Sequence, residues 1–275
     1  MKNNKIIIYD DNCPLCAAYS KLFVSAGMIK KENRKNFTTI DQSIIKLIDV
    51  TRCSNEIPVI DEQTHEVWYG IDAMTEILQY KIPFAKNIVY RKPVKWLLGR
   101  FYKFISYNRR VIVATKSRKG NFDCTPDFNY PYRLAFMFVF LLFNTIMLLP
   151  VHTHIINNSL LSVSAVQLQQ AHFLLVLVNV LCACSLHRKT AVDYLGQVNM
   201  LALTTILLLV PLIFLNKYGL AKGSLMNNIY LAILTLFIVK EYKRRMEYAG
   251  IIKKHPFIVV MNILSLAAFL TYLLC

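Results

Sequence analysis

The distribution of hydrophobic positions divides this chain into two unlike halves. No Asp, Glu, Lys or Arg occurs between Leu134 and Leu186. Three further apolar runs follow, at Tyr194–Asn216, Leu225–Val239 and Pro256–Cys275. A helix needs about 20 apolar residues to cross a hydrocarbon core of about 30 Å. The first run is longer than one span, and it is interrupted by Pro150 and by Asn157-Asn158-Ser159, a polar turn signal. We therefore predict an all-α membrane domain of about five helices, at about 133–150, 165–186, 194–216, 223–240 and 256–275, of which the fourth is short.

The loops between these spans carry charge of one sign on one side. Alternate loops contain twelve basic residues: Lys116, Arg118, Lys119, Arg133, Arg188, Lys189, Lys240, Lys243, Arg244, Arg245, Lys253 and Lys254. The opposite loops contain only Lys217 and Lys222. Because basic loops stay in the cytoplasm, this asymmetry predicts a multi-pass protein of the inner (plasma) membrane. Its N-terminal domain would be cytoplasmic and its C-terminus outside. The polar Met1–Lys5 does not resemble a signal peptide.

The first 82 residues show shorter, alternating elements. Strands are expected at Lys5–Tyr9, Asn36–Ile40, Ile57–Ile60 and Glu66–Tyr69. Helices are expected at Pro14–Ala26, Gln42–Val50 and Ile71–Tyr80. The resulting order, βαβ followed by ββα, is typical of a small layered α/β domain and is the minimal thioredoxin-like order. We therefore expect three regions: an α/β thioredoxin-like domain at 1–82, a basic neck at 83–132 and the membrane domain at 133–275.

Composition narrows the choice of function. The net charge of +16 would suit a polyanion partner, but 55% of the residues are hydrophobic. Residues 1–132 carry 21 Lys/Arg and 13 Asp/Glu, and residues 133–275 carry 11 and 3, so each part contributes +8. In the second part this charge is the loop charge that fixes orientation. The composition argues against disorder and against an ordinary nucleic-acid-binding domain.

One motif carries most of the chemistry. Asp10-Asp11-Asn12-Cys13-Pro14-Leu15-Cys16 follows the first predicted strand and opens the first predicted helix. Thiols at positions i and i+3 share one helix face, and a helix N-terminus stabilises a thiolate. Cys13 is therefore the expected nucleophile, Cys16 the resolving thiol, and Asp11 or Asn12 an expected helix cap.

Two other interpretations of the cysteine pair remain open. The pair could be half of a metal site or could be two inert thiols. A zinc site needs four ligands, and Cys53 and His65 are the only other Cys or His in the first 82 residues. We therefore expect a redox pair without a metal or cofactor.

Ile57-Pro58 forms a second part of the expected site. A cis proline at the start of this strand would shape a groove beside the cysteines, because cis bonds are nearly confined to X–Pro. A trans proline that merely opens a strand is the alternative. Cys53 is expected near Pro58 or simply buried.

These residues resemble the DCC family of predicted thiol-disulfide oxidoreductases. The family's Asp-x-x-Cys-x-x-Cys after a strand ending in Tyr is met by Tyr9, Asp10, Cys13 and Cys16. Two later family patterns are similar to Gly70-Ile71-Asp72-Ala73 and to the stretch from Tyr102 to Asn108-Arg109. The resemblance covers about residues 5–110. It implies protein-disulfide reductase chemistry on a thioredoxin-like fold, with a thiol or disulfide client.

The neck combines basic and apolar residues. It contains no acidic residue between Ile77 and Phe122. Five apolar residues fall on one helical face: Val94, Leu97, Leu98, Phe101 and Ile105. We expect an anionic lipid surface as partner, contacted by Lys92, Lys95, Trp96, Arg100 and Lys103. Packing of the apolar face on the rest of the chain is the alternative, and nucleic acid is disfavoured.

Polar residues within the predicted spans have mostly structural interpretations. His172 is expected to be a hydrogen-bonded structural histidine, although ionisable groups in spans are functional candidates. Asn144, Asn179, Asn199 and Asn262 are expected to link helices by hydrogen bonds. Cys182 and Cys184 lie about 200° apart around a helix and should not face one partner. His152 and His154 form only a weak metal motif.

The sequence thus favours a membrane-tethered thiol-disulfide oxidoreductase with Cys13 and Cys16 as catalytic residues. Asp10, Asp11, Pro14, Ile57 and Pro58 would shape the site. The alternative is a non-enzymatic membrane protein whose spans bind or transport a small molecule or partner. The Cys pair would then sense redox state or transfer a metal.

Overall fold

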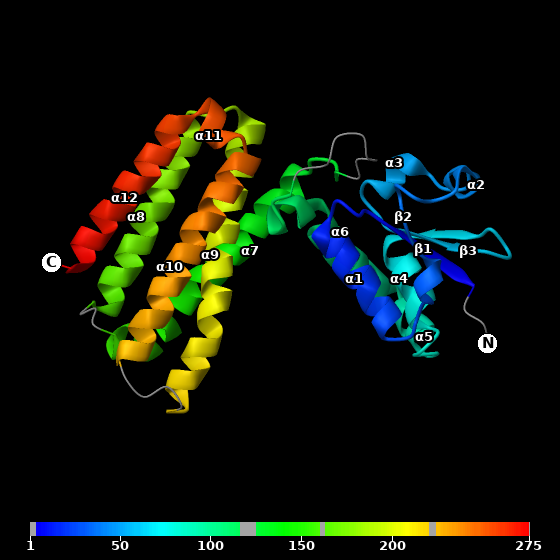
Figure 1. Ribbon diagram of the computed structural model, residues 1–275, viewed down its shortest axis with the longest axis horizontal. Coiled ribbons are helices and arrows are strands. Elements are labelled where there is room, and N and C mark those ends of the chain that lie inside the picture. Colours follow the sequence, from blue (N-terminus) through cyan, green and yellow to red (C-terminus); the bar gives the residue numbers. More distant parts are fainter. Residues whose placement is uncertain (1–3, 116–124, 160–162, 220–223, 275) are drawn as a thin grey trace. The chain divides into compact units, whose positions relative to one another are not determined.

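A computed structural model describes residues 4–115, 125–159, 163–219 and 224–274 of the chain (Figure 1). The chain separates into two compact units, Met1–Arg133 and Leu134–Cys275. Several residues of the sequence analysis lie outside the described part: Lys116, Arg118, Lys119, Phe122, Lys222 and Cys275.

The first unit contains a four-stranded mixed sheet. Its strands are β1 (Lys5–Tyr9), β2 (Arg34–Asn36), β3 (Pro58–Asp61) and β4 (Val67–Tyr69), in the spatial order β2-β1-β3-β4. β1 pairs with β2 in parallel and with β3 antiparallel, and β3 and β4 are antiparallel. The central strand β1 is therefore flanked on both sides, and the residues that follow its carboxyl end occupy the middle of the domain.

Alternation along β1 explains the two layers of core around the sheet. Ile7 belongs to a cluster with Val59, Ala73 and Ile77, on the side covered by α1 (Pro14–Ser25) and α4 (Gly70–Leu78). Ile6 and Ile8 belong to the opposite cluster. Successive strand side chains point to opposite faces, so three consecutive isoleucines suit a strand that is buried on both faces.

The remaining elements of the first unit are short until the neck. They are η1 (Lys31–Asn33), α2 (Gln42–Ile45), α3 (Val50–Cys53), α5 (Ala85–Val89) and α6 (Lys92–Ile112). The predicted second strand was placed too late, since β2 begins at Arg34 and ends at Asn36. The helix predicted over Gln42–Val50 begins at Gln42 but is too long, since α2 ends at Ile45. Asp49 caps the separate helix α3 by accepting a hydrogen bond from the Arg52 N–H (3.0 Å).

The second unit is helical. Its elements are α7 (Tyr130–His154, which begins before the unit boundary), η2 (Ile156–Asn158), α8 (Ala165–Cys184), α9 (Arg188–Lys217), α10 (Ser224–Tyr248), α11 (Ile251–Lys254) and α12 (Pro256–Leu274). α7 continues past the expected stop at Pro150, because Val151 and Ile155 are buried in the bundle core and hold its last turn.

Four of these helices are long and apolar enough to cross a membrane, at Tyr130–Asn158 (which includes η2), Ala165–Cys184, Arg188–Lys217 and Leu225–Tyr248. They indicate a multi-pass membrane protein. The fourth, expected to be short, is a full candidate span, and the shorter apolar helix is α12. The five-span prediction is thus confirmed for four helices.

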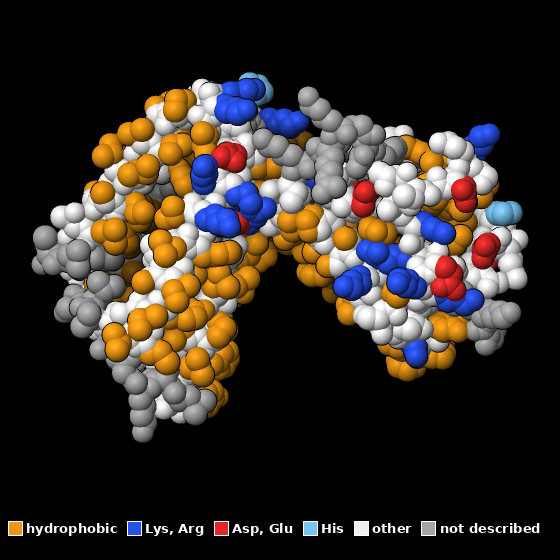
Figure 2. Space-filling view, in the orientation of Figure 1, with side chains coloured by type: hydrophobic (Ala, Val, Ile, Leu, Met, Phe, Trp, Pro, Cys, Tyr) orange, Lys and Arg blue, Asp and Glu red, His pale blue; other side chains and the backbone are white. Residues whose placement is uncertain are grey.

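The surface of the helical unit separates charge from hydrocarbon. Figure 2 shows Lys and Arg side chains toward the α11 end of the bundle and a largely hydrophobic surface over the rest of that face. Arg245 is buried at this charged end of the bundle. Arg245 bonds to Glu241 (2.8 Å) and to Gln197 (2.8 Å). Arg188 and Lys189 at the start of α9 and Lys253 and Lys254 of α11 flank one buried cluster at this end, which includes Leu186, Tyr194 and Ile251.

Candidate active site around a cysteine pair

Cys13 and Cys16 lie at the N-terminal end of α1, directly after the central strand. Cys13 is the N-cap residue and Pro14 occupies the first helical position, where its missing N–H costs nothing. Neither Asp11 nor Asn12 caps the helix, so that prediction was wrong. The chain turns instead on Asp10, whose Oδ1 accepts the Asn12 N–H (2.9 Å), and the exposed Asp11 accepts a hydrogen bond from Thr38 (3.2 Å).

The two thiols differ in acidity. The pKa of Cys13 is lowered to about 6, chiefly by a hydrogen bond from the Cys16 side chain. The Cys16 N–H and the Arg109 charge also lower it, while burial opposes the shift. The same hydrogen bond, together with burial, raises the pKa of Cys16 well above its ordinary value. Cys13 is therefore mostly thiolate at pH 7, while Cys16 keeps its proton. This asymmetry is what an attacking thiol and a resolving thiol require.

Arginine side chains from the end of α6 complete the site. The buried Arg109 donates a hydrogen bond to the Ser54 carbonyl (2.7 Å) and stabilises charge on the Cys13 sulfur. Arg110 pairs with Asp10 (3.3 Å), and both side chains are at most 4% exposed. Burial nevertheless raises the pKa of Asp10, and the Arg110 charge opposes that shift. The second half of the neck thus belongs to the active site and not to a separate region.

The start of β3 forms the opposite wall. Pro58, Cys53, Asp10, Cys16 and Arg109 are among the residues that line a cavity of about 10 Å³, the size of one water molecule. The Ile57–Pro58 bond is trans, which is the simpler of the two sequence expectations. Cys53 is both near Pro58 and buried, and burial raises its pKa to about 12, so it is a poor nucleophile.

Tyr102 and Gly70 hold Ile57 in place. The Ile57 N–H donates to the Tyr102 hydroxyl (2.9 Å), and the Ile57 carbonyl accepts the Gly70 N–H (3.0 Å). Gly70 has a φ of +57°, and an added Cβ would lie 3.3 Å from Tyr102 and from Glu56. A side chain there would strain the backbone and press on Tyr102. This explains why a glycine stands at this position of the predicted motif.

The cysteines are covered in this structure. Cys13 is 1% exposed and Cys16 is 3% exposed. The residues after α6 are fastened to the turn before Cys13, because the Thr115 hydroxyl (3.3 Å) and Arg110 Nη1 (3.4 Å) both donate to the Asn12 carbonyl. A protein disulfide can reach Cys13 only after its cover moves.

Outside this site, several expectations about Cys and His can be checked. Cys182 is buried and Cys184 is exposed, in agreement with their separation around the helix. His152 Nε2 is hydrogen-bonded to the Val163 carbonyl (2.8 Å). Within the described residues there is no group of three or more His, Cys, Asp or Glu that could hold a metal ion.

The sequence does not predict three residues as contributors to this site: Tyr102, Arg109 and Arg110. Tyr102 and Arg109 stand there only as parts of a family pattern, and Arg110 is one basic residue among many in the neck. The available signal was the Asn108-Arg109 pair, which follows the last apolar position of the neck's helical face.

Comparison with known proteins agrees with this geometry. Residues 7–114 match the family described as DCC1-like thiol-disulfide oxidoreductase. No curated protein and no solved structure is similar enough to the chain to count as a match. Residues 7–114, with the Cys13–Cys16 pair near their start, are a domain of the DCC1-like thiol-disulfide oxidoreductase family, and four long apolar helices follow.

Proposed function

We propose that this domain reduces protein disulfides by thiol–disulfide exchange, with Cys13 as the nucleophile and Cys16 as the resolving thiol. The observation that carries the proposal is the opposite displacement of two neighbouring pKa values. The pKa of Cys13 is lowered to about 6, and that of Cys16 is raised. Two inert buried thiols would both have raised pKa values, as Cys53 does.

The exchange proceeds in two balanced steps. The Cys13 thiolate attacks one sulfur of the client disulfide, forms a mixed disulfide and releases the first client thiolate. Cys16 then loses its proton, and its thiolate attacks the Cys13 sulfur. The second client thiolate leaves, so the client gains two electrons and the Cys13–Cys16 disulfide forms. A thiol reductant of the cell must reduce that disulfide before the next cycle.

Asp10 is the base we propose for the second step. It lines the same water-sized cavity as Cys16, and burial raises its pKa. A carboxylate with a raised pKa accepts a proton more readily. Asp10→Asn should therefore slow the release of the mixed disulfide while leaving the first attack by Cys13 intact.

We propose a thioredoxin-like fold for the domain. The order β2-β1-β3-β4, with one parallel and two antiparallel pairings, supports this assignment, as does the position of the cysteines at the start of the helix after the central strand. The Ile57–Pro58 bond is trans, whereas the groove expected from the sequence has a cis bond at this position.

We also propose that the domain faces the cytoplasm and that α12 is a fifth span with its C-terminus outside. α12 has 19 residues, about 28 Å of helix at 1.5 Å per residue, close to a bilayer core. The basic end of the bundle, with Arg188, Lys189, Lys253 and Lys254, supports the orientation. A cytoplasm kept reducing favours a reductase over an oxidase.

The exposed side of the neck supports an anionic lipid surface as partner. The predicted apolar face is divided: Val94, Leu98 and Ile105 are half-buried, while Leu97 and Phe101 are exposed. A mixed basic and apolar surface is therefore left outward, formed by Lys92, Trp96, Leu97, Arg100, Phe101 and Lys103. Lys95 contributes less than expected, because it pairs with Asp72 (2.8 Å).

A liposome test addresses this surface. A fragment of residues 1–129 should bind anionic vesicles, release in high salt and ignore zwitterionic vesicles. The double substitution Lys92→Glu and Lys103→Glu should abolish binding. Lys21→Glu, at an exposed position of α1, is the matched control and should bind normally. Binding that is indifferent to salt or to vesicle charge would refute the proposal.

The exchange activity itself is tested with the full chain in lipid nanodiscs. Cys13→Ser and Cys16→Ser should each abolish reduction of insulin, and Cys16→Ser should hold a mixed disulfide. Cys53→Ser is the matched control, since Cys53 lines the same small cavity but has a raised pKa. Reduction of insulin by the Cys13→Ser variant would contradict the proposed exchange mechanism. A potential of the Cys13–Cys16 couple well above the glutathione pool would overturn the reductase direction alone.

A further inference from the structure

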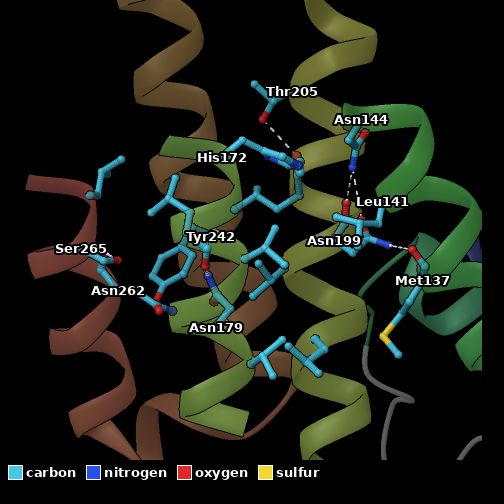
Figure 3. A pocket seen from close by; sticks show the side chains of 18 of the residues that line it. Met137, Leu141, Asn144, His172, Asn179, Asn199, Thr205, Tyr242, Asn262 and Ser265 are labelled. Carbon is cyan, nitrogen blue, oxygen red and sulfur yellow. Dashed lines mark hydrogen bonds between the residues drawn. The ribbon is translucent and has the colours of Figure 1, made fainter. Parts of the chain in front are cut away.

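The helical unit contains a cavity of about 490 Å³ (Figure 3). Residues of α7, α8, α9, α10 and α12 line it, and none of them is Asp, Glu, Lys or Arg. The volume lies within the range of small-molecule sites. A site lined by apolar and neutral polar groups suits an uncharged ligand, because a charged one would lose its hydration without gaining a counter-charge.

Asn144 presents an unsatisfied acceptor at this cavity. Its Nδ2 donates to Asn199 Oδ1 (3.2 Å), and Asn199 in turn donates to the Met137 carbonyl (2.8 Å), as Figure 3 shows. Asn144 is 2% exposed, and its Oδ1 receives no hydrogen bond from the described residues. Buried acceptors are normally paired, so this oxygen is a place where a ligand donor would be favoured.

His172 supplies a second acceptor. The Thr145 hydroxyl has one proton and donates it to the Leu141 carbonyl (2.8 Å). With the proton so placed, the imidazole tautomer that carries its proton on Nε2 satisfies the 3.1 Å contact between Thr145 Oγ1 and His172 Nε2. A neutral imidazole with its proton on Nε2 has Nδ1 as a free acceptor, and no hydrogen bond from the described residues reaches that atom. The structural role expected for His172 is confirmed by its bond to Thr145, and the ring keeps capacity for a ligand.

The cavity is accessible from the lipid side of the bundle. Leu134, Phe138, Val180 and Leu266 line it and are also 42–69% exposed. These side chains belong to candidate spans and to α12, whose outer surface is hydrophobic (Figure 2). A ligand that enters between them must dissolve in hydrocarbon.

We propose that this cavity binds a neutral, lipid-soluble molecule whose head group carries a hydroxyl. The hydroxyl would donate to Asn144 Oδ1 or His172 Nδ1, and the apolar remainder would lie along the leucine and valine side chains toward the rim. The head can be aromatic, as in a phenol or quinol, or aliphatic, as in a long-chain alcohol. The proposal uses no residue of the cysteine site and stands or falls apart from the exchange activity.

The test is saturable binding of tritiated 4-dodecylphenol to the full chain in zwitterionic nanodiscs, with empty nanodiscs as the background. We expect one site per chain. 4-Dodecylanisole, the same molecule with its hydroxyl methylated, should compete about tenfold more weakly, the factor for one lost hydrogen bond. 1-Dodecanol separates the two head-group classes: competition equal to the phenol supports an aliphatic alcohol, and weaker competition supports an aromatic one.

Two variants place the site. Asn144→Leu removes the acceptor at similar volume and should weaken phenol binding about tenfold. Thr205→Val is the matched control in the same cavity, because the Thr205 hydroxyl already donates its proton to the Leu201 carbonyl of its own helix (2.9 Å). If Asn144→Leu does not fold, His172→Phe is the second variant that tests the site. Equal binding of phenol and anisole by the wild-type chain would mean a crevice filled by acyl chains and would overturn the proposal. An absence of saturable binding would also overturn the proposal. So would Asn144→Leu and His172→Phe variants that bind the phenol as tightly as the wild type does.

Discussion

The two units of this protein bury polar groups of different kinds. In the first unit the buried groups near the cysteines include the charged side chains Asp10, Arg109 and Arg110. In the helical unit the groups that link helices away from the basic end are neutral, such as the Asn144–Asn199 pair. A charge can shift the pKa of a thiol, whereas a neutral amide can orient an uncharged ligand. The first unit is therefore suited to chemistry at a charged thiolate, and the helical unit is suited to a membrane and to an uncharged ligand.

The largest expected effect concerns the charged pair. Arg110→Met leaves Asp10 buried without its partner and should destabilise the first unit by about 3–5 kcal/mol at neutral pH. Folding raises the pKa of Asp10, so the protonated form favours the fold, and the penalty should grow as pH rises through the folded pKa. Both tryptophans of the chain, Trp68 and Trp96, lie in this unit, so tryptophan fluorescence of the full chain during urea unfolding measures the effect. Asp10→Asn, which removes the charge, should cost less. A penalty for Arg110→Met that is small and independent of pH would contradict the account.

The next effect concerns the thiol. Arg109→Gln removes a charge that lowers the pKa of Cys13, so its pKa should rise above about 6. Alkylation of Cys13 at pH 6 should slow several-fold, by roughly the fraction of thiolate lost. Iodoacetamide labelling followed by mass spectrometry measures the rate. Lys103→Gln, an exposed change on the same helix, should have no such effect, and equal rates in both variants would exclude Arg109 from the site.

A smaller effect is expected in the helical unit. Asn199→Ala removes the contacts with Asn144 and with the Met137 carbonyl. Hydrogen bonds between membrane helices contribute about 0.6 kcal/mol on average and about 1.7 at most. Unfolding by dodecyl sulfate, followed by circular dichroism, should reveal a change of that size. A loss of stability as large as that expected for Arg110→Met would contradict the proposed difference between the two units.

The smallest effect concerns access to Cys13. Thr115→Val keeps the shape of the side chain but removes its hydrogen bond to the Asn12 carbonyl (3.3 Å). Alkylation of Cys13 at saturating thiolate should become about two- to threefold faster, as expected for the loss of about 0.5 kcal/mol. Thr51→Val, at an exposed position of α3, serves as the control. Identical rates would mean that this hydrogen bond does not restrict access.

Local patterns allowed much of the fold to be predicted, but not the contacts made between distant segments. Three isoleucines and a Cys-x-x-Cys before a helix locate β1, α1 and the two thiols from sequence alone. Arg110 is 100 residues from Asp10, and nothing local distinguishes it from the other basic residues of the neck. Arg109 stands out only through the family pattern Asn108-Arg109, and the other residues of the neck suggested a membrane surface. The helix predicted from Gln42 ran on to Val50 and missed the start of α3 there, because the Asp49 cap acts only through its hydrogen bonds.

The most direct test of the central claim is the pH dependence of Cys13 alkylation in the reduced full chain, with each cysteine identified by mass spectrometry. The structure gives Cys13 a pKa of about 6 and Cys16 a raised one. The alkylation rate of Cys13 should therefore rise with a midpoint near pH 6 and level off above pH 7, while Cys16 and Cys53 stay unreactive. A midpoint for Cys13 above pH 8, the value of an ordinary thiol, would contradict the assignment of Cys13 as the nucleophile.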